Sequence, residues 1–434
     1  MNYERCLQSA ILRALVPLSS LFLLTDLTAG PANGQVTAFR LPLSGFVARE
    51  SLSDQDASED NSPAESADES DDEPADNTPP DTEAGRHEEA APRSIAGPAV
   101  SPIEADDIRT TAEFLQRRER IRECLRLHFA RPEDSTVRSP WGLMHGMLAF
   151  GIDTEVIVQG HRVNAVNWLC RNGKGQDLQI LEVRRGKLQP TSGPGVQGHD
   201  AQLLFMLAQC KVPIDHPIVV DRYHFTVADL VEFEKSTCES GLELNFKLVG
   251  LIHYLDSDAS WTTRKRERWD IPRIIREELT QPIVGACCGG THRLMGFSYA
   301  VRKREQRGEP VVGQWLRAKT FIEDYQRYAF KLQYPDGSFS TDWFRSRQKS
   351  DDMNRALETT GHMFEWLAFS LPDEELTEPH VVKTVDYLCG QFLENRDHEW
   401  GVGPKGHALH SLALYDERVF GSKPGNRPFL TARQ

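Results

Sequence analysis

The residues with the clearest chemical potential are histidines that recur beside a glycine turn, each at the start of an apolar stretch. They are His145, His199, His292, His362 and His407, and a sixth copy of the pattern carries Phe246 in the histidine position. In chain order these anchors are separated by 54, 47, 46, 70 and 45 residues. Self-similarity at a recurring period of this length indicates a repeat architecture.

Two copies add a second polar side chain one helical turn after the histidine. His362-x-x-Glu365 and His407-x-x-His410 are i, i+3 pairs, so both members of each pair project from one face of a helix. Imidazole and carboxylate groups bind divalent metals such as zinc, and a Glu–His pair can act as general acid and base. The candidate metal ligands are therefore His362, Glu365, His407 and His410, and His292 joins these four as a candidate catalytic residue.

The same histidines also have a structural interpretation. A histidine just after a glycine turn can cap a helix and satisfy its free backbone groups, or it can pack between neighbouring copies. If the helices run parallel, their N-termini meet at one rim, where an anion would be favoured. Cys287 and Cys288 precede one such helix, either as activated thiols or as small core residues. The sequence is compatible with capping, with proton transfer and with metal binding.

The elements that must position these residues are pairs of helices. Residues two and five positions after each anchor are apolar, as are residues on the opposite face, and a helix apolar all round is buried on both sides. We expect six inner helices, each followed by an outer helix, with starts near residues 140, 199, 244, 291, 361 and 406. Alternation within residues 177–195 predicts one small β-hairpin. The predicted fold is an all-α, six-fold α/α toroid.

One segment supports this fold by resemblance. Gln333-Tyr334-Pro335-Asp336-Gly337-Ser338-Phe339 is similar to the Gln-Trp motif of the terpenoid cyclase/protein prenyltransferase α/α-toroid superfamily, with Phe339 in place of the tryptophan. The resemblance covers residues 110–420 at the level of repeats and implies the toroid. The catalytic motifs of the superfamily are absent: Ser350-Asp351-Asp352 does not match the cyclase acid, and Asp386-x-x-Cys389 does not match the prenyltransferase zinc set. The resemblance therefore implies a fold and no particular activity.

Charge is distributed very unevenly along the chain. Residues 51–90 hold 15 acidic residues and one basic residue, a net charge of −14, which equals the net charge of the whole chain. The remainder is neutral overall and has no basic excess, which excludes a nucleic-acid partner. The acidic segment has almost no large apolar residue, and we expect it to be disordered.

The N-terminus has the pattern of an export signal. Arg5 and Arg13 precede the apolar run 14–24, and small residues follow up to Gly34. We expect a signal peptide at 1–34, a disordered acidic linker at 35–107, the toroid at 108–420 and a C-terminal tail at 421–434. Retention of the first segment as an anchor is the alternative, and we expect no transmembrane segment in the mature chain.

These features indicate a secreted or periplasmic protein. We expect a non-catalytic binding or envelope-assembly module that uses the central cavity, with a lipid, a glycan or an envelope protein as partner. The alternative is an exported enzyme acting on a polyisoprenoid lipid or a polysaccharide through the His/Glu site, with or without a divalent metal such as zinc.

Overall fold

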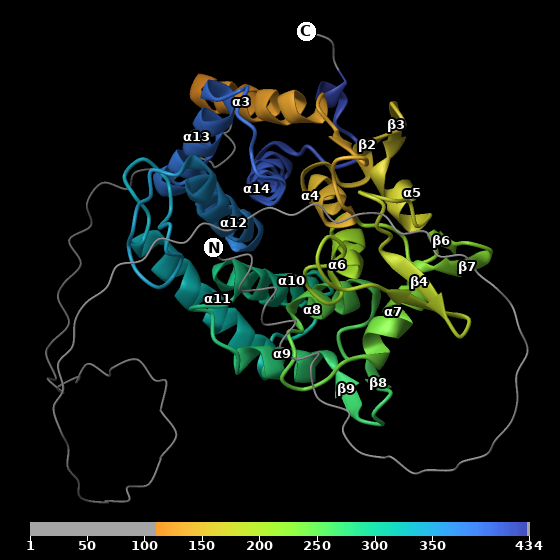
Figure 1. Ribbon diagram of the computed structural model, residues 1–434. Helices are drawn as coiled ribbons and strands as arrows, with labels where there is room; N and C mark the ends of the chain where they lie inside the picture. The colour runs from red at the N-terminus through yellow and green to blue at the C-terminus, as the bar shows by residue number, and fades with distance from the viewer. Residues whose placement is uncertain (1–109, 432–434) are drawn as a thin grey trace, which may run out of the picture. The chain divides into compact units, whose positions relative to one another are not determined.

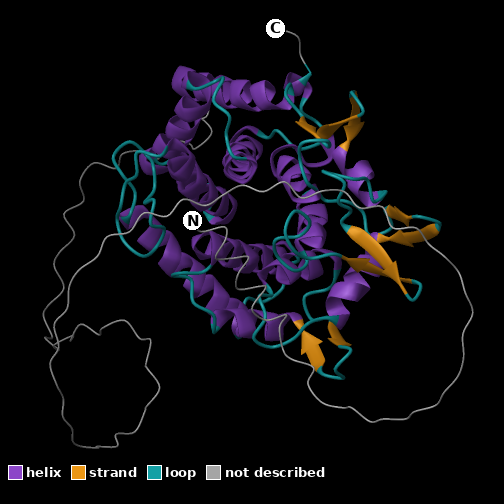
Figure 2. Ribbon diagram, viewed as in Figure 1, coloured by secondary structure: helices purple, strands orange, loops and turns teal. Residues whose placement is uncertain are grey.

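The computed structural model describes residues 110–431, which are mostly helical with small β-hairpins (Figures 1 and 2). The expected signal peptide and acidic linker lie outside the described residues. Within the described part, no helix combines the length and the apolar character that crossing a membrane would require.

Six helices, one from each copy of the repeat, form an inner layer. They are α4 (Pro140–Phe150), α6 (Gln202–Gln209), α8 (Asn245–Tyr254), α10 (Thr291–Gln306), α12 (Met353–Ser370) and α14 (Val402–Phe420). Each contacts the next along the chain, and α14 contacts α4, so the contacts form a closed cycle (Figure 1). The first eight residues of α8 are all buried, as expected for a helix that is covered on both sides.

The remaining helices lie outside this layer, and each packs against at least one inner helix. They are α3 (Ala112–Phe129), α5 (Ala165–Cys170), α7 (Val227–Ser236), α9 (Ile271–Leu279), α11 (Gln314–Lys331) and α13 (Pro379–Glu394). The first described helix, α3, packs on α13 and α14, and also on the short turn η4 (Pro428–Leu430) near the end of the chain. The two ends of the described chain therefore meet at one place.

Hairpins make up most of the strand content. The expected one is present as β4 (Leu181–Arg184) and β5 (Lys187–Pro190). Three more were not expected, and each connects an inner helix to its outer helix: β2 (Glu155–Val158) with β3 (His161–Asn164), β6 (Pro217–Val220) with β7 (Tyr223–Thr226), and β8 (Ser260–Thr262) with β9 (Arg268–Asp270). The two-residue strand β1 (Glu133–Asp134) pairs with β2.

The three connecting hairpins share a local cause. The last residue of each second strand is also the N-cap of the following outer helix: Asn164, Thr226 and Asp270. The Asn164 and Asp270 side chains accept hydrogen bonds from the first-turn backbone, whereas Thr226 donates from its backbone N–H and its hydroxyl to the Asp229 carboxylate one turn on. In each case the chain passes from strand to helix without a loop.

Two inner helices begin earlier than expected. The helix α12 begins at Met353 because the Asp352 carboxylate accepts hydrogen bonds from the backbone of Asn354 and Arg355, and α14 begins at Val402. Gly361 and Gly406 therefore lie inside helices and not in turns. A Cβ on Gly361 would lie 2.9 Å from the Ala408 Cβ, and one on Gly406 would lie 2.6 Å from the His145 carbonyl oxygen. These glycines allow neighbouring inner helices to approach closely.

The Gln333 motif joins two outer helices. The Gln333 side-chain amide donates to the His380 carbonyl at 2.9 Å and to the Thr384 hydroxyl at 2.8 Å, both on α13. Gly337 has φ +92°, and a Cβ there would meet the Lys383 carbonyl, so only glycine fits this turn. The motif thus holds the end of α11 against the start of α13.

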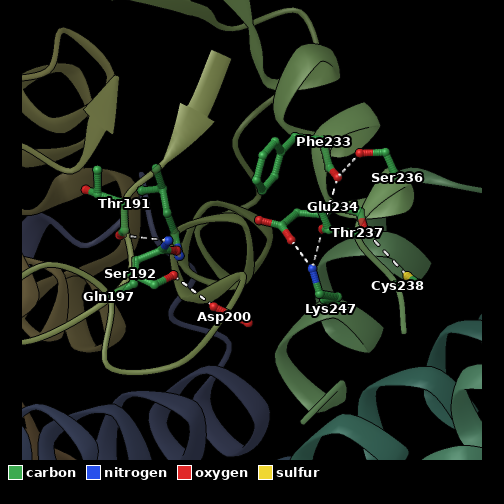
Figure 3. Close-up of polar contacts among 11 residues, drawn as sticks. Thr191, Ser192, Gln197, Asp200, Phe233, Glu234, Ser236, Thr237, Cys238 and Lys247 are labelled. Carbon is green, nitrogen blue, oxygen red and sulfur yellow. Dashed lines mark hydrogen bonds and ion pairs between the residues drawn. The ribbon is translucent and has the colours of Figure 1, made fainter. Parts of the chain in front are cut away.

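Two buried ion pairs repeat at equivalent positions. Lys247 and Arg293 each follow an anchor by one residue, and each bonds a glutamate in the last turns of the preceding outer helix. Lys247 pairs with Glu234 and donates to the Thr237 hydroxyl at 2.8 Å (Figure 3). The Arg293 Nε donates to Glu278 at 2.8 Å. Both pairs are almost completely buried and tie an inner helix to its outer neighbour.

Candidate metal centre

The six repeat anchors come together inside the inner layer. They are His145, His199, Phe246, His292, His362 and His407. The His292 ring lies at the middle of the set, with centroids 5.3 Å from His199, 5.5 Å from His362 and 5.4 Å from His407. The set thus gathers five imidazoles from five different copies.

Phe246 occupies the place of the missing imidazole. Its ring stacks on His199, with centroids 4.4 Å apart, and lies edge-on to His292 at 5.0 Å. The alignment of Phe246 with the histidines therefore corresponds to a real spatial equivalence, and one sector of the cluster is apolar.

The histidines do not act as helix caps, which corrects one interpretation of the sequence. His145 and His407 lie in the second turn of their helices, and His362 lies in the third. The Nδ1 atoms of His145 and His362 instead donate to the carbonyls of Trp141 and Glu358, one turn back, both at 2.7 Å. Because these rings lie inside helices, the expected anion site at a rim of helix N-termini is not formed by them.

Three further imidazoles bond a carboxylate through Nδ1. The Nδ1 of His407 bonds Glu365 Oε2 at 2.7 Å, and the Nδ1 of His410 bonds Glu365 Oε1 at 2.5 Å. The Nδ1 of His199 bonds Glu243 at 2.7 Å. An Nδ1 that faces an oxygen acceptor carries a proton, so each of these rings donates to its carboxylate.

Burial determines the charge of these groups. Burial would raise the pKa of Glu365, but His407 and His410 hold it well below its usual range, so the carboxylate is ionised. Burial and the neighbouring His407 lower the pKa of His145 to about 3. Burial and neighbouring imidazoles also lower the pKa values of His292 and His362 well below the ordinary value. These rings are therefore neutral at pH 7, which is the form that binds a metal.

One group among the described residues has the donor spacing of a metal site. Cys288 Sγ and a ring nitrogen each of His292 and His362 lie within 4.8 Å of one another. Neither nitrogen of His292 has a hydrogen-bond partner, although both are buried. An unsatisfied buried polar atom is costly, and it indicates an unfilled ligand role.

Cys288 is held in an unusual backbone conformation. Its φ and ψ are 49° and 36°, in the left-handed region, and Gly289 and Gly290 follow with φ values of 63° and 77°. A non-glycine residue rarely adopts this conformation, and such residues concentrate at functional sites. The turn, η2 (Cys287–Gly290), positions the thiol immediately before α10 and facing His292. Burial raises the pKa of the Cys288 thiol, and a bound cation would reverse that effect.

The four expected metal ligands lie close together, but only one of them belongs to the group with the spacing of a metal site. His362, Glu365, His407 and His410 lie in adjacent helices, and the His362 ring stacks on the His407 ring at 3.7 Å. Glu365, however, is already bonded by His407 and His410 through both of its oxygens. Only His362 of these four belongs to the group with ligand spacing, and His292, expected as a catalytic residue, is its second member.

The residue missed by sequence reasoning as a ligand is Cys288. A usable signal was present, because Cys288-x-x-x-His292 places a thiol beside a repeat histidine across two glycines. The cysteines of the described part that are free are Cys124, Cys170, Cys210, Cys238, Cys288 and Cys389. Of these six, all but Cys288 are buried, as small core residues are.

Comparisons of the sequence and structure with protein families, with curated proteins and with solved structures gave no match.

Proposed function

We propose that this protein is an exported, six-fold α/α toroid that binds one zinc-type transition-metal ion through Cys288, His292 and His362. The observation that carries the proposal is the His292 ring, whose two buried nitrogens have no partner although a thiol and a second imidazole lie within 4.8 Å. A metal ion would satisfy one of these nitrogens and would balance the cost of burying the ring.

The chemistry of the donor set favours zinc. One thiolate and two neutral imidazoles are borderline-soft ligands, which zinc and copper accept more readily than magnesium or calcium. Metal–ligand bonds of about 2.0–2.3 Å require donor separations of roughly 3.5 Å, so modest side-chain movements would close this group on an ion. The Glu358 carbonyl already orients His362 through Nδ1, as outer-sphere acceptors do for metal-binding histidines.

The toroid assignment is supported by the closed cycle of inner-helix contacts and by the resemblance of the Gln333 motif to the terpenoid cyclase/protein prenyltransferase superfamily. Six side chains at one level of the inner layer pack against one another. A cross-section filled in this way leaves no room for a polymer chain to pass. We therefore favour a metal-binding module of the cell envelope or its exterior over an enzyme that threads a lipid or glycan.

Metal analysis of the purified protein tests this function. We expect about one zinc per chain, lost on Cys288→Ser and retained on Cys238→Ser, which changes a buried free cysteine outside the group. Substitution by cobalt should produce a thiolate charge-transfer band only when Cys288 is present. Copper in place of zinc would change the metal but keep the site. A metal-free wild-type protein that takes up no metal would contradict the proposal.

A further inference from the structure

A cavity lies at the opposite ends of the inner helices from the histidine anchors. It has a volume of about 200 Å³ and is bounded by the C-terminal parts of all six inner helices. His410 also lines it, and the Nδ1 of this residue is held by Glu365. The cavity is therefore adjacent to the histidine cluster but shares no residue with Cys288, His292 and His362.

The lining has a clear excess of positive charge. Its cations are Lys211, Arg302, Lys303, Arg418 and Arg427, and its one acidic residue is Glu417. Lys211 pairs with Glu417 and Arg418 pairs with Asp373. Within residues 110–431, no carboxylate lies within ion-pair distance of the other three. The surplus charge belongs to Arg302, Lys303 and Arg427.

Helix termination explains part of this arrangement. The last carbonyls of a helix have no partner in the helix, and arginines often bind them. Arg302 donates to the Phe369 carbonyl at 2.5 Å, and Arg427 donates to the Ala149 carbonyl at 2.8 Å. These bonds use one nitrogen of each guanidinium. They explain why Arg302 and Arg427 lie at the C-terminal ends of inner helices.

Helix termination does not explain the donors that remain. Arg427 is 6 % exposed, and its Nε is buried without an acceptor. The Gln209 Nε2, from the last turn of α6, is also buried without an acceptor in the same lining. The Lys303 ammonium makes no hydrogen bond to any described residue and lies over the Tyr299 ring at 5.9 Å. Burial, together with the neighbouring Arg307 and Lys211, lowers the pKa of Lys303.

The walls of the cavity are apolar and aromatic. The Tyr299 and Phe369 rings stack with centroids 5.5 Å apart and planes 6° apart, and Leu148 and Leu414 complete the apolar part of the lining. The Tyr299 hydroxyl is bonded to His253 Nδ1 at 2.6 Å, so this side chain is fixed in place. Rigid apolar walls with a few convergent donors are typical of a small-molecule site.

We infer that this cavity binds a small organic oxyanion, with a phosphate or carboxylate head and a compact apolar body. The head accepts hydrogen bonds from Arg427 Nε, from the Gln209 amide and from Lys303, and the body packs on Tyr299 and Phe369. Arginine and lysine bind both kinds of oxyanion through charge-assisted hydrogen bonds. This site is independent of the proposed metal centre.

Calorimetric titration of the purified full-length protein tests the inference, with phenyl phosphate, benzoate, inorganic phosphate and phenol as probes. Phenyl phosphate or benzoate should bind saturably, and the tighter of the two identifies the head group. Inorganic phosphate should bind more weakly because it lacks the body, and phenol should not bind because it lacks the charge.

Variants locate the binding. Lys303→Gln and Gln209→Leu should each weaken the preferred probe by roughly ten-fold or more, the usual effect of losing a charge-assisted or buried hydrogen bond. Lys187→Gln removes the same charge from an exposed side chain at the start of β5, outside the cavity lining, and should leave the affinity unchanged. Circular dichroism verifies that each variant is folded. Absence of saturable binding by both organic anions, or equal affinity in wild type, Lys303→Gln and Gln209→Leu, would overturn the inference.

Discussion

Gly361 on α12 lies so close to Ala408 on α14 that a Cβ on the glycine would come within 2.9 Å of the alanine Cβ. This contact joins the two inner helices that carry His362 and His407 and allows their rings to stack. The glycine beside each histidine is therefore part of the packing between copies.

Gly361→Ala should destabilise the protein, because the added methyl group meets backbone atoms that cannot move away. We expect a loss of roughly 1–3 kcal/mol in the free energy of unfolding, the usual cost of overpacking. Gly390→Ala on α13 is the matched control, since a Cβ there meets only the end of Glu394 at 3.6 Å. It should stabilise by up to about 1 kcal/mol through helix propensity. Urea unfolding measures both, and equal effects would contradict the close approach.

Relative to wild type, Cys288→Gly should stabilise the metal-free protein and destabilise the protein in the presence of zinc. Glycine adopts the left-handed conformation of Cys288 without strain, so the metal-free variant should be more stable than metal-free wild type by about 1 kcal/mol. With zinc in excess the order should reverse, because only wild type gains binding free energy, about 2.7 kcal/mol at a hundred-fold excess over Kd. Thermal unfolding with zinc and with a chelator measures this. If wild type and Cys288→Gly were stabilised equally by zinc, Cys288 would be excluded as a ligand.

Glu365→Gln should loosen the histidine cluster but keep the metal. An amide offers one acceptor in place of two, so His407 or His410 loses its Nδ1 partner. We expect the free energy of unfolding to fall by roughly 1–3 kcal/mol, the cost of an unsatisfied buried donor. Glu358→Gln, a partly exposed residue on the same helix, should change it little. Both variants should contain as much metal as wild type. This result would show that Glu365 stabilises the cluster and is not a metal ligand.

Lys247→Met should lower the free energy of unfolding, because it breaks the buried Lys247–Glu234 pair shown in Figure 3. Burial raises the pKa of Glu234 although Lys247 opposes this effect, so removing the lysine leaves an unpaired buried acid. We expect a loss of roughly 3–5 kcal/mol, largely recovered when Glu234→Met is added. Lys265→Met breaks an exposed pair with Glu239 and should cost under about 1 kcal/mol. A double variant no more stable than Lys247→Met would contradict the argument.

His128 should make the protein sensitive to mild acid. Burial, with Lys405 and Arg131, lowers its pKa to about 3, whereas an unfolded histidine titrates near 6.5. The stability that comes from burying neutral His128 is therefore fully present above about pH 6.5. It is lost as the pH falls toward 3, because the unfolded chain binds the proton more readily than the folded protein. His128→Gln should reduce the loss of stability between pH 8 and pH 5 by roughly 1–2 kcal/mol. His161→Gln, on the exposed strand β3, is the control and should leave the pH dependence unchanged.

The repeat was visible in the sequence because packing constrains each copy in the same way. The anchor alignment even placed Phe246 correctly, since a ring of similar size fills the same place in the cluster. The starts of α12 and α14 were wrong because Gly361 and Gly406 were read as turns, whereas they accommodate a neighbouring helix.

Some of the missed features are local, and one depends on a contact between distant residues. The hairpins β6–β7 and β8–β9 have strands of only three or four residues, and they form where the N-caps Thr226 and Asp270 end a strand and begin a helix. Cys288 becomes a candidate ligand only when His362, from another copy, is beside it. The local pattern Cys288-x-x-x-His292 contains two of the three donors, but it does not indicate the third.

The closed cycle of inner helices also constrains the order of folding. The first inner helix, α4, has its second neighbour in α14, the last helix of the chain, so the final contact must await almost the whole sequence. Contacts between residues so distant in sequence form slowly, because a long loop must close before they stabilise anything. Until then, α4 and α12 each present an uncovered apolar face, and a chain interrupted before Val402 would keep those faces exposed. The cycle of inner-helix contacts therefore closes only when α14 has packed. Truncation or destabilisation of α14 should cause the domain to aggregate.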